Sequence, residues 1–236
     1  MIPLRDSLKS RSFPLVTVLL ILANILVFFA SSQVGPEASR LLEPLAFVPR
    51  HFFLWHGGSL DWERWQPLLT AMFLHAGLLH LGSNMWFLWV FGNSVEDRLG
   101  HVRYLLFYLV CGVASFVVQG LSAPYSRIPA LGASGAISGV LGAYLFLFAR
   151  ARILTLVPIV IIPWLVEIPA FVFLGVWFLL QFFYGTASVA GQGGVAWWAH
   201  IGGFVTGFAL CWLLRRSGAH PPRTFESPRP HNVWLR

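Results

Sequence analysis

The chain of 236 residues is 57% hydrophobic and only 11% charged, and this balance excludes an ordinary soluble domain. Sixteen Lys and Arg against nine Asp and Glu give a net charge of +7. The basic residues lie at the ends of apolar runs, so they indicate membrane topology and contact with anionic lipid headgroups, not nucleic-acid binding. Cys111 and Cys211 lie inside apolar segments without metal-ligand spacing, so we expect neither a zinc site nor a disulfide.

Six apolar runs are close to the roughly 20 residues that a helix needs to cross a bilayer. We therefore expect an all-α, multi-pass integral membrane protein, a bundle of six transmembrane helices in contact with the lipid bilayer. The fifth run follows Ile153–Val166, which is equally apolar but is interrupted by Pro158 and Pro163. This stretch is expected to lie along the interface or to form a bent start of the span. The six predicted spans are Phe13–Ala30, Leu68–Phe91, Tyr104–Leu121, Ala133–Ala149, Ile168–Phe183 and Val195–Leu214.

The distribution of basic residues predicts the orientation of these spans. Twelve Lys and Arg lie on the side that holds both termini, against four on the other side, so both termini are expected in the cytoplasm. The predicted organisation is a cytoplasmic segment over residues 1–12, a six-span domain over 13–214 and a disordered basic tail over 215–236. The long connection Ser31–Gln66 carries several Trp and Phe side chains and is expected to be an external interfacial element.

Strongly polar side chains in three predicted spans indicate a functional site, because such groups are costly in the membrane. Span two holds His75, His80 and Asn84, span four opens with Ser134, and span six carries His200. All three spans are expected to run from outside to inside, which places these residues at similar depth. His80 and Asn84 are four apart and share a helix face, whereas His75 and His80 would diverge by about 140° on one helix.

Small residues form one stripe in span four and another in span six, and such stripes allow close helix packing. We expect these two spans to pack together and to bring the Ser134 hydroxyl to the His200 imidazole. The stripes consist of Gly135, Gly139 and Ala143, and of Ala199, Gly203 and Gly207.

A serine becomes nucleophilic when a base accepts its proton, so Ser134 and His200 together favour acyl-transfer chemistry. No Asp lies in a predicted span and Glu167 is the only acid near one, so a dyad is expected. Donors for the oxyanion are expected from the backbone at Gly132 and the start of span four, and from His80 and Asn84. His75, Gly135 and Gly203 are assigned supporting roles.

Three motifs follow one another in register along the chain: HxxxN at His80–Asn84, GxSG at Gly132–Gly135 and a histidine followed by glycines at His200–Gly203. In all three the chain resembles the rhomboid family of intramembrane serine proteases, where they are the oxyanion element, the surroundings of the nucleophile and the basic-histidine motif. The resemblance covers residues 13–214. It implies a transmembrane helix as substrate, admitted beside span five and cleaved near its outer end, and no metal or other cofactor. Two positions differ: Ser138 replaces a common tyrosine, and Trp65-Gln66 replaces Trp-Arg.

Several other interpretations compete with the protease. Ser134 alone would be an ordinary helix-capping serine, and His75, His80 and His200 together could be ligands of a metalloprotein. A rhomboid-like protein that binds transmembrane clients without cleaving them is the remaining alternative. We expect the bacterial plasma membrane as location and leave the oligomeric state open.

Overall fold

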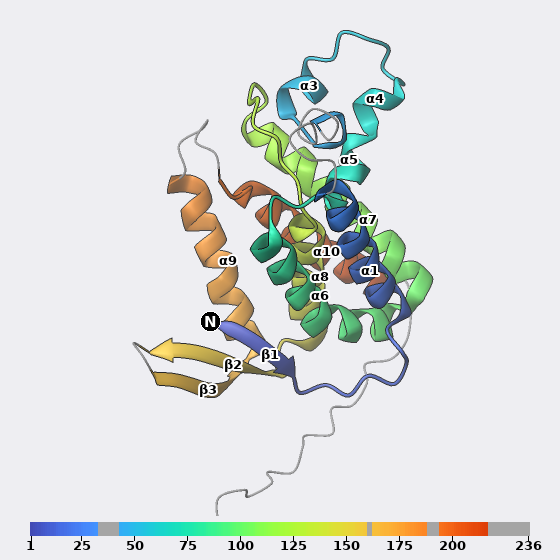
Figure 1. Cartoon of the computed structure of the whole chain (residues 1–236). Helices are drawn as coiled ribbons and strands as arrows, with labels where there is room; N and C mark the ends of the chain where they lie inside the picture. Colours follow the sequence, from blue (N-terminus) through green and yellow to red (C-terminus); the bar gives the residue numbers. More distant parts are fainter. Residues whose placement is uncertain (33–42, 160–161, 188–193, 217–236) are drawn as a thin grey trace, which may run out of the picture.

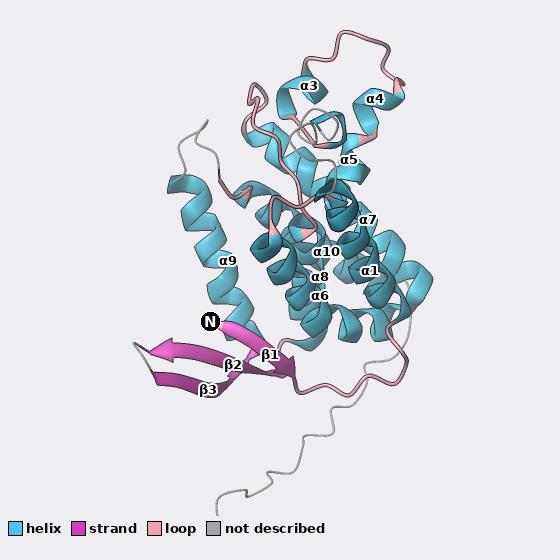
Figure 2. Ribbon diagram, viewed as in Figure 1, coloured by secondary structure: helices cyan, strands magenta, loops and turns pink. Residues whose placement is uncertain are grey.

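The computed structural model describes residues 1–32, 43–159, 162–187 and 194–216 of the chain. Helices dominate these residues, and a small sheet lies at one end of the bundle (Figures 1 and 2). The predicted tail lies outside the described residues from position 217 onwards. The longer helices are α1 Leu15–Ser32, α6 Leu78–Leu99, α7 His101–Ser122, α8 Ser134–Phe148, α9 Ala170–Ala187 and α10 Trp197–Arg216.

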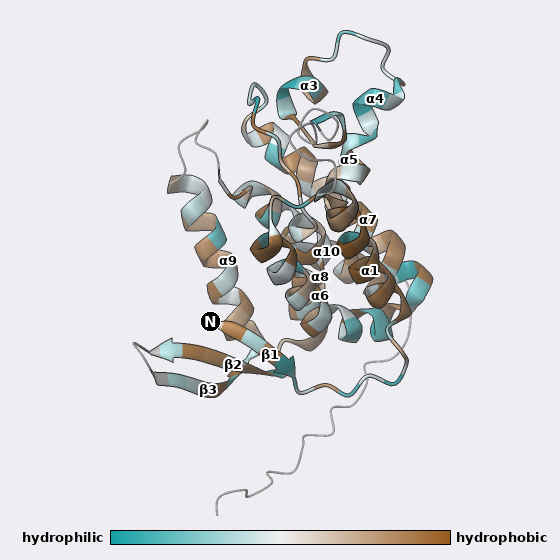
Figure 3. Ribbon diagram, viewed as in Figure 1, coloured by the Kyte–Doolittle hydropathy of each residue, from teal (hydrophilic) through white to brown (hydrophobic). Residues whose placement is uncertain are grey.

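Four helices in the described part of the chain are long and apolar enough to cross a membrane: α1, α7, α9 and Trp197–Leu214 of α10. α8 is also apolar but has only 15 residues, and α6 has 22 residues of more mixed composition. The expectation of six spans therefore stays a prediction, while a multi-pass membrane protein agrees with the helices observed. Figure 3 shows that α1 is hydrophobic along most of its length.

The predicted second span begins in the wrong place. Residues 67–73 form the short helix α5 Pro67–Thr70 and the 3-10 turn η3 Ala71–Phe73, and α6 begins only at Leu78. These residues and the connection after them are mostly apolar, with Thr70 and His75 as exceptions. Leu74 and Gly77 nevertheless have extended backbones, which end one helix before the next starts. His75 thus lies in a connection and not on the helix that carries His80.

α8 lies at the centre of the bundle, between α6, α7 and α10 (Figure 1). Ten consecutive residues of α8, from Gly135 to Tyr144, are buried. Its small residues let α10 approach closely: a Cβ at Gly203 would collide with the Gly135 carbonyl oxygen, and one at Gly207 with that of Gly139. The predicted packing of these two stripes is confirmed.

An antiparallel sheet in the order β1–β2–β3 corrects the expectation of an all-α protein. β1 covers Ile2–Asp6, within the predicted N-terminal segment, and β2 Arg152–Ile159 pairs with β3 Ile162–Pro169. The stretch expected to be an interfacial segment or a bent helix start is thus a hairpin, which leads directly into α9. Asp6 anchors the sheet, since its Oδ2 accepts hydrogen bonds from Ser94 of α6 at 2.6 Å and Tyr144 of α8 at 3.0 Å.

Glu96 ties α1 to α6 at the same end of the bundle. It is fully buried, and its carboxylate accepts hydrogen bonds at 2.8 Å from the amides of Val16 and Thr17 in the first turn of α1. A carboxylate is favourable at a helix N-terminus because the free amides and the helix dipole both attract it. The expectation that Glu167 is the only acid near a span is therefore wrong.

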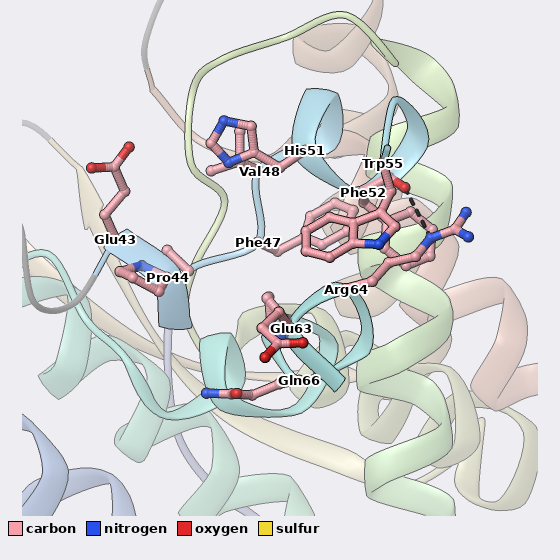
Figure 4. Close-up of a pocket in the computed structure, with 12 residues that line it drawn as sticks. Glu43, Pro44, Phe47, Val48, His51, Phe52, Trp55, Glu63, Arg64 and Gln66 are labelled. Carbon is pink, nitrogen blue, oxygen red and sulfur yellow. Dashed lines mark hydrogen bonds between the residues drawn. The ribbon is translucent and has the colours of Figure 1, made fainter. Parts of the chain in front are cut away.

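The described part of the connection between α1 and α5, residues 43–66, packs around aromatic side chains. It contains the 3-10 turn η2 Glu43–Leu45 and the short helices α3 Pro49–Phe53 and α4 Trp62–Trp65. The Arg64 guanidinium lies 5.1 Å from the Phe52 ring centre, and its Nε donates to the Phe52 carbonyl oxygen at 3.1 Å. These side chains border a cavity of about 280 Å³ that Glu63 also lines (Figure 4).

Candidate active site

The hydroxyl of Ser134 and the imidazole of His200 are in hydrogen-bond contact. Ser134 is the first residue of α8 and His200 lies in the first turn of α10. The distance from His200 Nε2 to Ser134 Oγ is 2.9 Å. His200 is buried and Ser134 is partly exposed, and both line the same cavity. Two residues 66 positions apart thus form a hydrogen-bonded serine–histidine pair, which is the least that nucleophilic catalysis by a serine requires.

The small residues next to each member of the pair determine this distance. Gly135 follows Ser134 and packs against Ser115 and the Ala199 carbonyl, and Gly203 lies one turn after His200 against the Gly135 carbonyl. Since the helix backbones themselves are in contact, short side chains such as serine suffice to bridge the helices. The structure therefore brings Ser134, His200, Gly135 and Gly203 together, as the sequence predicted.

Gly132 forms the turn that precedes the nucleophile. Its φ of +116° disfavours any side chain, and a Cβ would lie 2.8 Å from the His80 ring. The Gly132 amide already donates to the Ala71 carbonyl oxygen at 2.8 Å. This hydrogen bond argues against the expected oxyanion donor at Gly132, because the amide is engaged elsewhere. The amides of the first turn of α8 remain suitable, since a helix start leaves them without intrahelical acceptors.

Asn84 has the environment expected of an oxyanion donor. Its side chain is buried, and its Nδ2 has no hydrogen-bond partner within the described residues. Asn84, His80, Ser134 and His200 all line one cavity of about 1150 Å³ between α6, α8, α9 and α10. A buried donor without an acceptor is costly, so the Asn84 side chain is a candidate donor to a developing negative charge.

His75 lies closer to His80 than the sequence suggested. The two ring centres are 5.1 Å apart in an edge-on arrangement, so the predicted divergence of 140° is wrong. The prediction assumed a common helix, whereas His75 precedes α6. His75 Nδ1 lies 3.3 Å from the Phe73 carbonyl oxygen. Among the described residues no group of three His, Cys, Asp or Glu side chains could hold a metal ion, so the metalloprotein alternative gains no support.

Gln181 of α9 is a site residue that the sequence analysis missed. Its Oε1 lies 2.8 Å from His200 Nδ1, on the side of the ring opposite Ser134. The Trp177 ring, also from α9, lies 6.0 Å from the His200 ring and is inclined to it by 34°. The available signal was one amide side chain in an otherwise apolar run, which a search for ionisable residues passes over.

A family model described as Rhomboid domain matches residues 61–217, about two thirds of the chain. The chain belongs to the rhomboid family. One relative is RHOMBOID-like protein 6, mitochondrial, of Arabidopsis thaliana, which is 34% identical over 66% of this chain and 48% of that protein. Another is rhomboid protease GluP of Bacillus subtilis, which is 31% identical over 91% of this chain and 38% of that protein. Putative rhomboid protease YdcA of Bacillus subtilis is 32% identical over 58% and 64%. The chain thus spans less than half the length of the first two relatives.

Ser138 occupies the position, one turn after Ser134, where a tyrosine is common in the family, and here it makes a hydrogen bond within its own helix. Ser138 is buried, and its hydroxyl donates to the Ser134 carbonyl oxygen at 2.6 Å, so it does not face the imidazole. The rings near His200 are Trp177 of α9 and Trp197 of α10, at 6.0 and 6.1 Å between centres. Within the described residues, the ring contacts of His200 therefore come from α9 and α10.

Proposed function

We propose that this rhomboid is an intramembrane serine endopeptidase that cleaves single-span membrane proteins near the outer end of their transmembrane helix. The observation that carries the proposal is the hydrogen bond between Ser134 Oγ and His200 Nε2 inside a cavity large enough for an extended peptide segment. Relatives named as rhomboid proteases at about 31% identity support the same reaction class.

The chemistry follows from the positions of the side chains. His200 Nε2 accepts the proton of the Ser134 hydroxyl as Oγ attacks a peptide carbonyl carbon, and the oxygen of that carbonyl becomes negative. The Asn84 Nδ2 group and the first amides of α8 donate hydrogen bonds to it. The His200 imidazolium then protonates the leaving amine. Water next attacks the ester on Ser134, with His200 as base, and this second step restores the free hydroxyl.

The substrate class is proposed from the surroundings of the dyad. The cavity is bordered by α6 and α9, and both helices carry exposed aromatic side chains, such as Trp86 and Phe182, of the kind that face lipid. A substrate helix would reach the dyad sideways from the membrane. The proposal also includes a six-span topology with both termini in the cytoplasm. It places the protein in a bacterial plasma membrane.

Cleavage of a single-span reporter in liposomes tests the function. We expect Ser134→Ala and His200→Ala each to abolish cleavage while the protein remains folded, as judged by its thermal unfolding in detergent. Thr186→Val is the control, because within the described residues this α9 hydroxyl bonds to carbonyls of its own helix, at Phe182 and Phe183. Cleavage by the Ser134→Ala variant would refute the proposal. Folded wild-type protein that retains the reporter without cutting it would support a client-binding protein instead.

A further inference from the structure

Gln181 is the one polar side chain among the buried residues of α9; the others are Ala170, Phe173, Leu174 and Gly185. A polar group in this position is costly unless its hydrogen bonds are made. Both ends of the amide are in fact engaged. Gln181 Nε2 donates to the Trp177 carbonyl oxygen at 3.2 Å, and Oε1 faces His200 Nδ1 at 2.8 Å.

These two contacts determine where the proton of the neutral His200 ring lies. Because the Gln181 amide nitrogen is held by the Trp177 carbonyl, the atom that reaches His200 is the oxygen, which can only accept. His200 Nδ1 must therefore carry the hydrogen, and Nε2 keeps its lone pair. Nε2 is the atom that lies 2.9 Å from Ser134 Oγ. The amide thus selects the tautomer that can accept the serine proton.

The contact depends on how α9 lies against α10. One turn after Gln181, a Cβ at Gly185 would lie 3.3 Å from Trp197 Cβ and 3.6 Å from Ile201 Cδ1, so the two helices touch here. Many apolar side chains of α9 are exposed instead, among them Leu179, Leu180 and Phe183. Figure 1 shows α9 standing at the side of the bundle, whereas α8 and α10 lie within it.

We propose that Gln181 is a positioning residue that holds His200 in the tautomer required for proton transfer, so that the dyad is competent only while α9 is packed against α10. This inference rests on the proposed function. If a substrate displaced α9 on entering the cavity, the contact between Gln181 and His200 would be lost. His200 would be oriented again only after α9 had packed back against α10. Docking of one helix and orientation of the base are then a single event.

Three variants of the full chain test the role of the amide, with the rate of Ser134 labelling by a fluorophosphonate as readout. Gln181→Met has a similar shape but no acceptor, and Gln181→Glu keeps an acceptor oxygen. The control Gln119→Met makes the same change at a residue of α7 whose Oε1 accepts from the Ala199 amide at 3.1 Å, next to His200 but not on its ring.

We expect Gln181→Met to lower the labelling rate about 10–100-fold, less than the roughly 10⁴ that loss of the orienting aspartate costs in a Ser-His-Asp triad, because a neutral amide stabilises the imidazolium less. Gln181→Glu should restore most of the rate. In cleavage assays the Gln181→Met loss should appear in kcat, with KM unchanged. Gln119→Met should lower thermal stability but leave the labelling rate within about threefold. The hydrogen bond from the Ala199 amide to the Gln119 side chain contributes to stability but does not determine the tautomer of His200.

A double-mutant cycle tests the coupling to α9. Gly185→Leu places a side chain between α9 and α10 and should slow labelling, whereas Gly175→Leu, at a position of α9 with no atom within 4 Å of an added Cβ, should not. If α9 acts through Gln181, adding Gln181→Met to Gly185→Leu lowers the rate no further. Losses that multiply would overturn the coupling.

The outcomes separate this inference from the proposed function. Wild-type protein that is not labelled at Ser134 contradicts the protease itself. Wild-type protein that is labelled at Ser134, together with Gln181→Met labelled equally fast, contradicts only the positioning role. A slow Gln181→Met that Gln181→Glu fails to rescue, while both unfold at the wild-type temperature, also contradicts it, because the acceptor would then be irrelevant.

Discussion

The α8–α10 interface and helix α9 contribute to the same site in opposite ways. Between α8 and α10 the backbones touch, because a Cβ added at Gly203 or Gly207 would collide with the carbonyl oxygen of Gly135 or Gly139. No side chain could be added to α10 at those two positions without moving a helix. α9 buries few residues and contacts the site through Gln181 and Trp177. The difference shows that the distance between nucleophile and base is set by rigid packing, while the orientation of the base depends on the most loosely packed helix of the site.

The largest effect is expected from a substitution in the tight interface. Gly203→Ala introduces a methyl group against the Gly135 carbonyl oxygen, which must move and take Ser134 with it. We predict no detectable cleavage and a clear loss of thermal stability. Gly175→Ala on α9 is the matched control, because its added methyl group meets no atom within 4 Å and alanine favours a helix more than glycine does. Equal cleavage rates and equal thermal stabilities of the two variants would show that the α8–α10 interface does not control the site.

A smaller effect is expected from Asn84→Ala, which leaves both the packing and the dyad in place. Removal of one oxyanion donor typically lowers turnover about 10²–10³-fold, so we predict a loss in this range with little change in stability. Asn93→Ala makes the same change more than two turns further along α6 and should retain wild-type activity. Full activity of the Asn84→Ala variant would exclude this residue from oxyanion stabilisation and leave its unpartnered donor unexplained.

The smallest effect is expected on the pH dependence of stability, through Asp6 in the sheet that leads into α9. Burial raises the pKa of the Asp6 carboxyl above its usual 3.8, so the folded protein holds this proton more tightly than the unfolded chain does. The resulting stabilisation is complete below pH 3.8 and is lost as the pH rises through the raised pKa. We predict that the free energy of unfolding of the wild type falls over this range relative to Asp6→Asn. Parallel curves for the two proteins would show that the partly buried surroundings of Asp6 do not raise its pKa.

The site was predictable where it depends on residues whose type is unusual in an apolar helix and indicates catalytic chemistry. Ser134 and His200 stand out because polar groups are rare in apolar helices, and the glycine stripes beside them predict which helices meet. Gln181 carries no charge and belongs to no motif, so nothing in its sequence neighbourhood identifies it as the partner of His200. Its role depends on how α9 docks, which is a property of the tertiary structure.

The fold was predictable at the level of apolar runs but not of their internal structure. The run that contains β2 and β3 is apolar on both faces of the hairpin, so it lacks the alternation that marks a strand. Leu74 and Ala76 continue the apolar run through the connection before α6, where His75 and Gly77 interrupt it. The hairpin and the true start of α6 both follow from backbone geometry that hydropathy does not report.

The central claim is that His200 activates Ser134, and labelling with a fluorophosphonate probe followed by mass mapping tests it most directly. The account predicts that the wild-type protein carries the phosphonate on Ser134 alone, and that His200→Ala, still folded, is labelled far more slowly. Modification at another residue, or unchanged labelling of Ser134 in the His200→Ala variant, would contradict it.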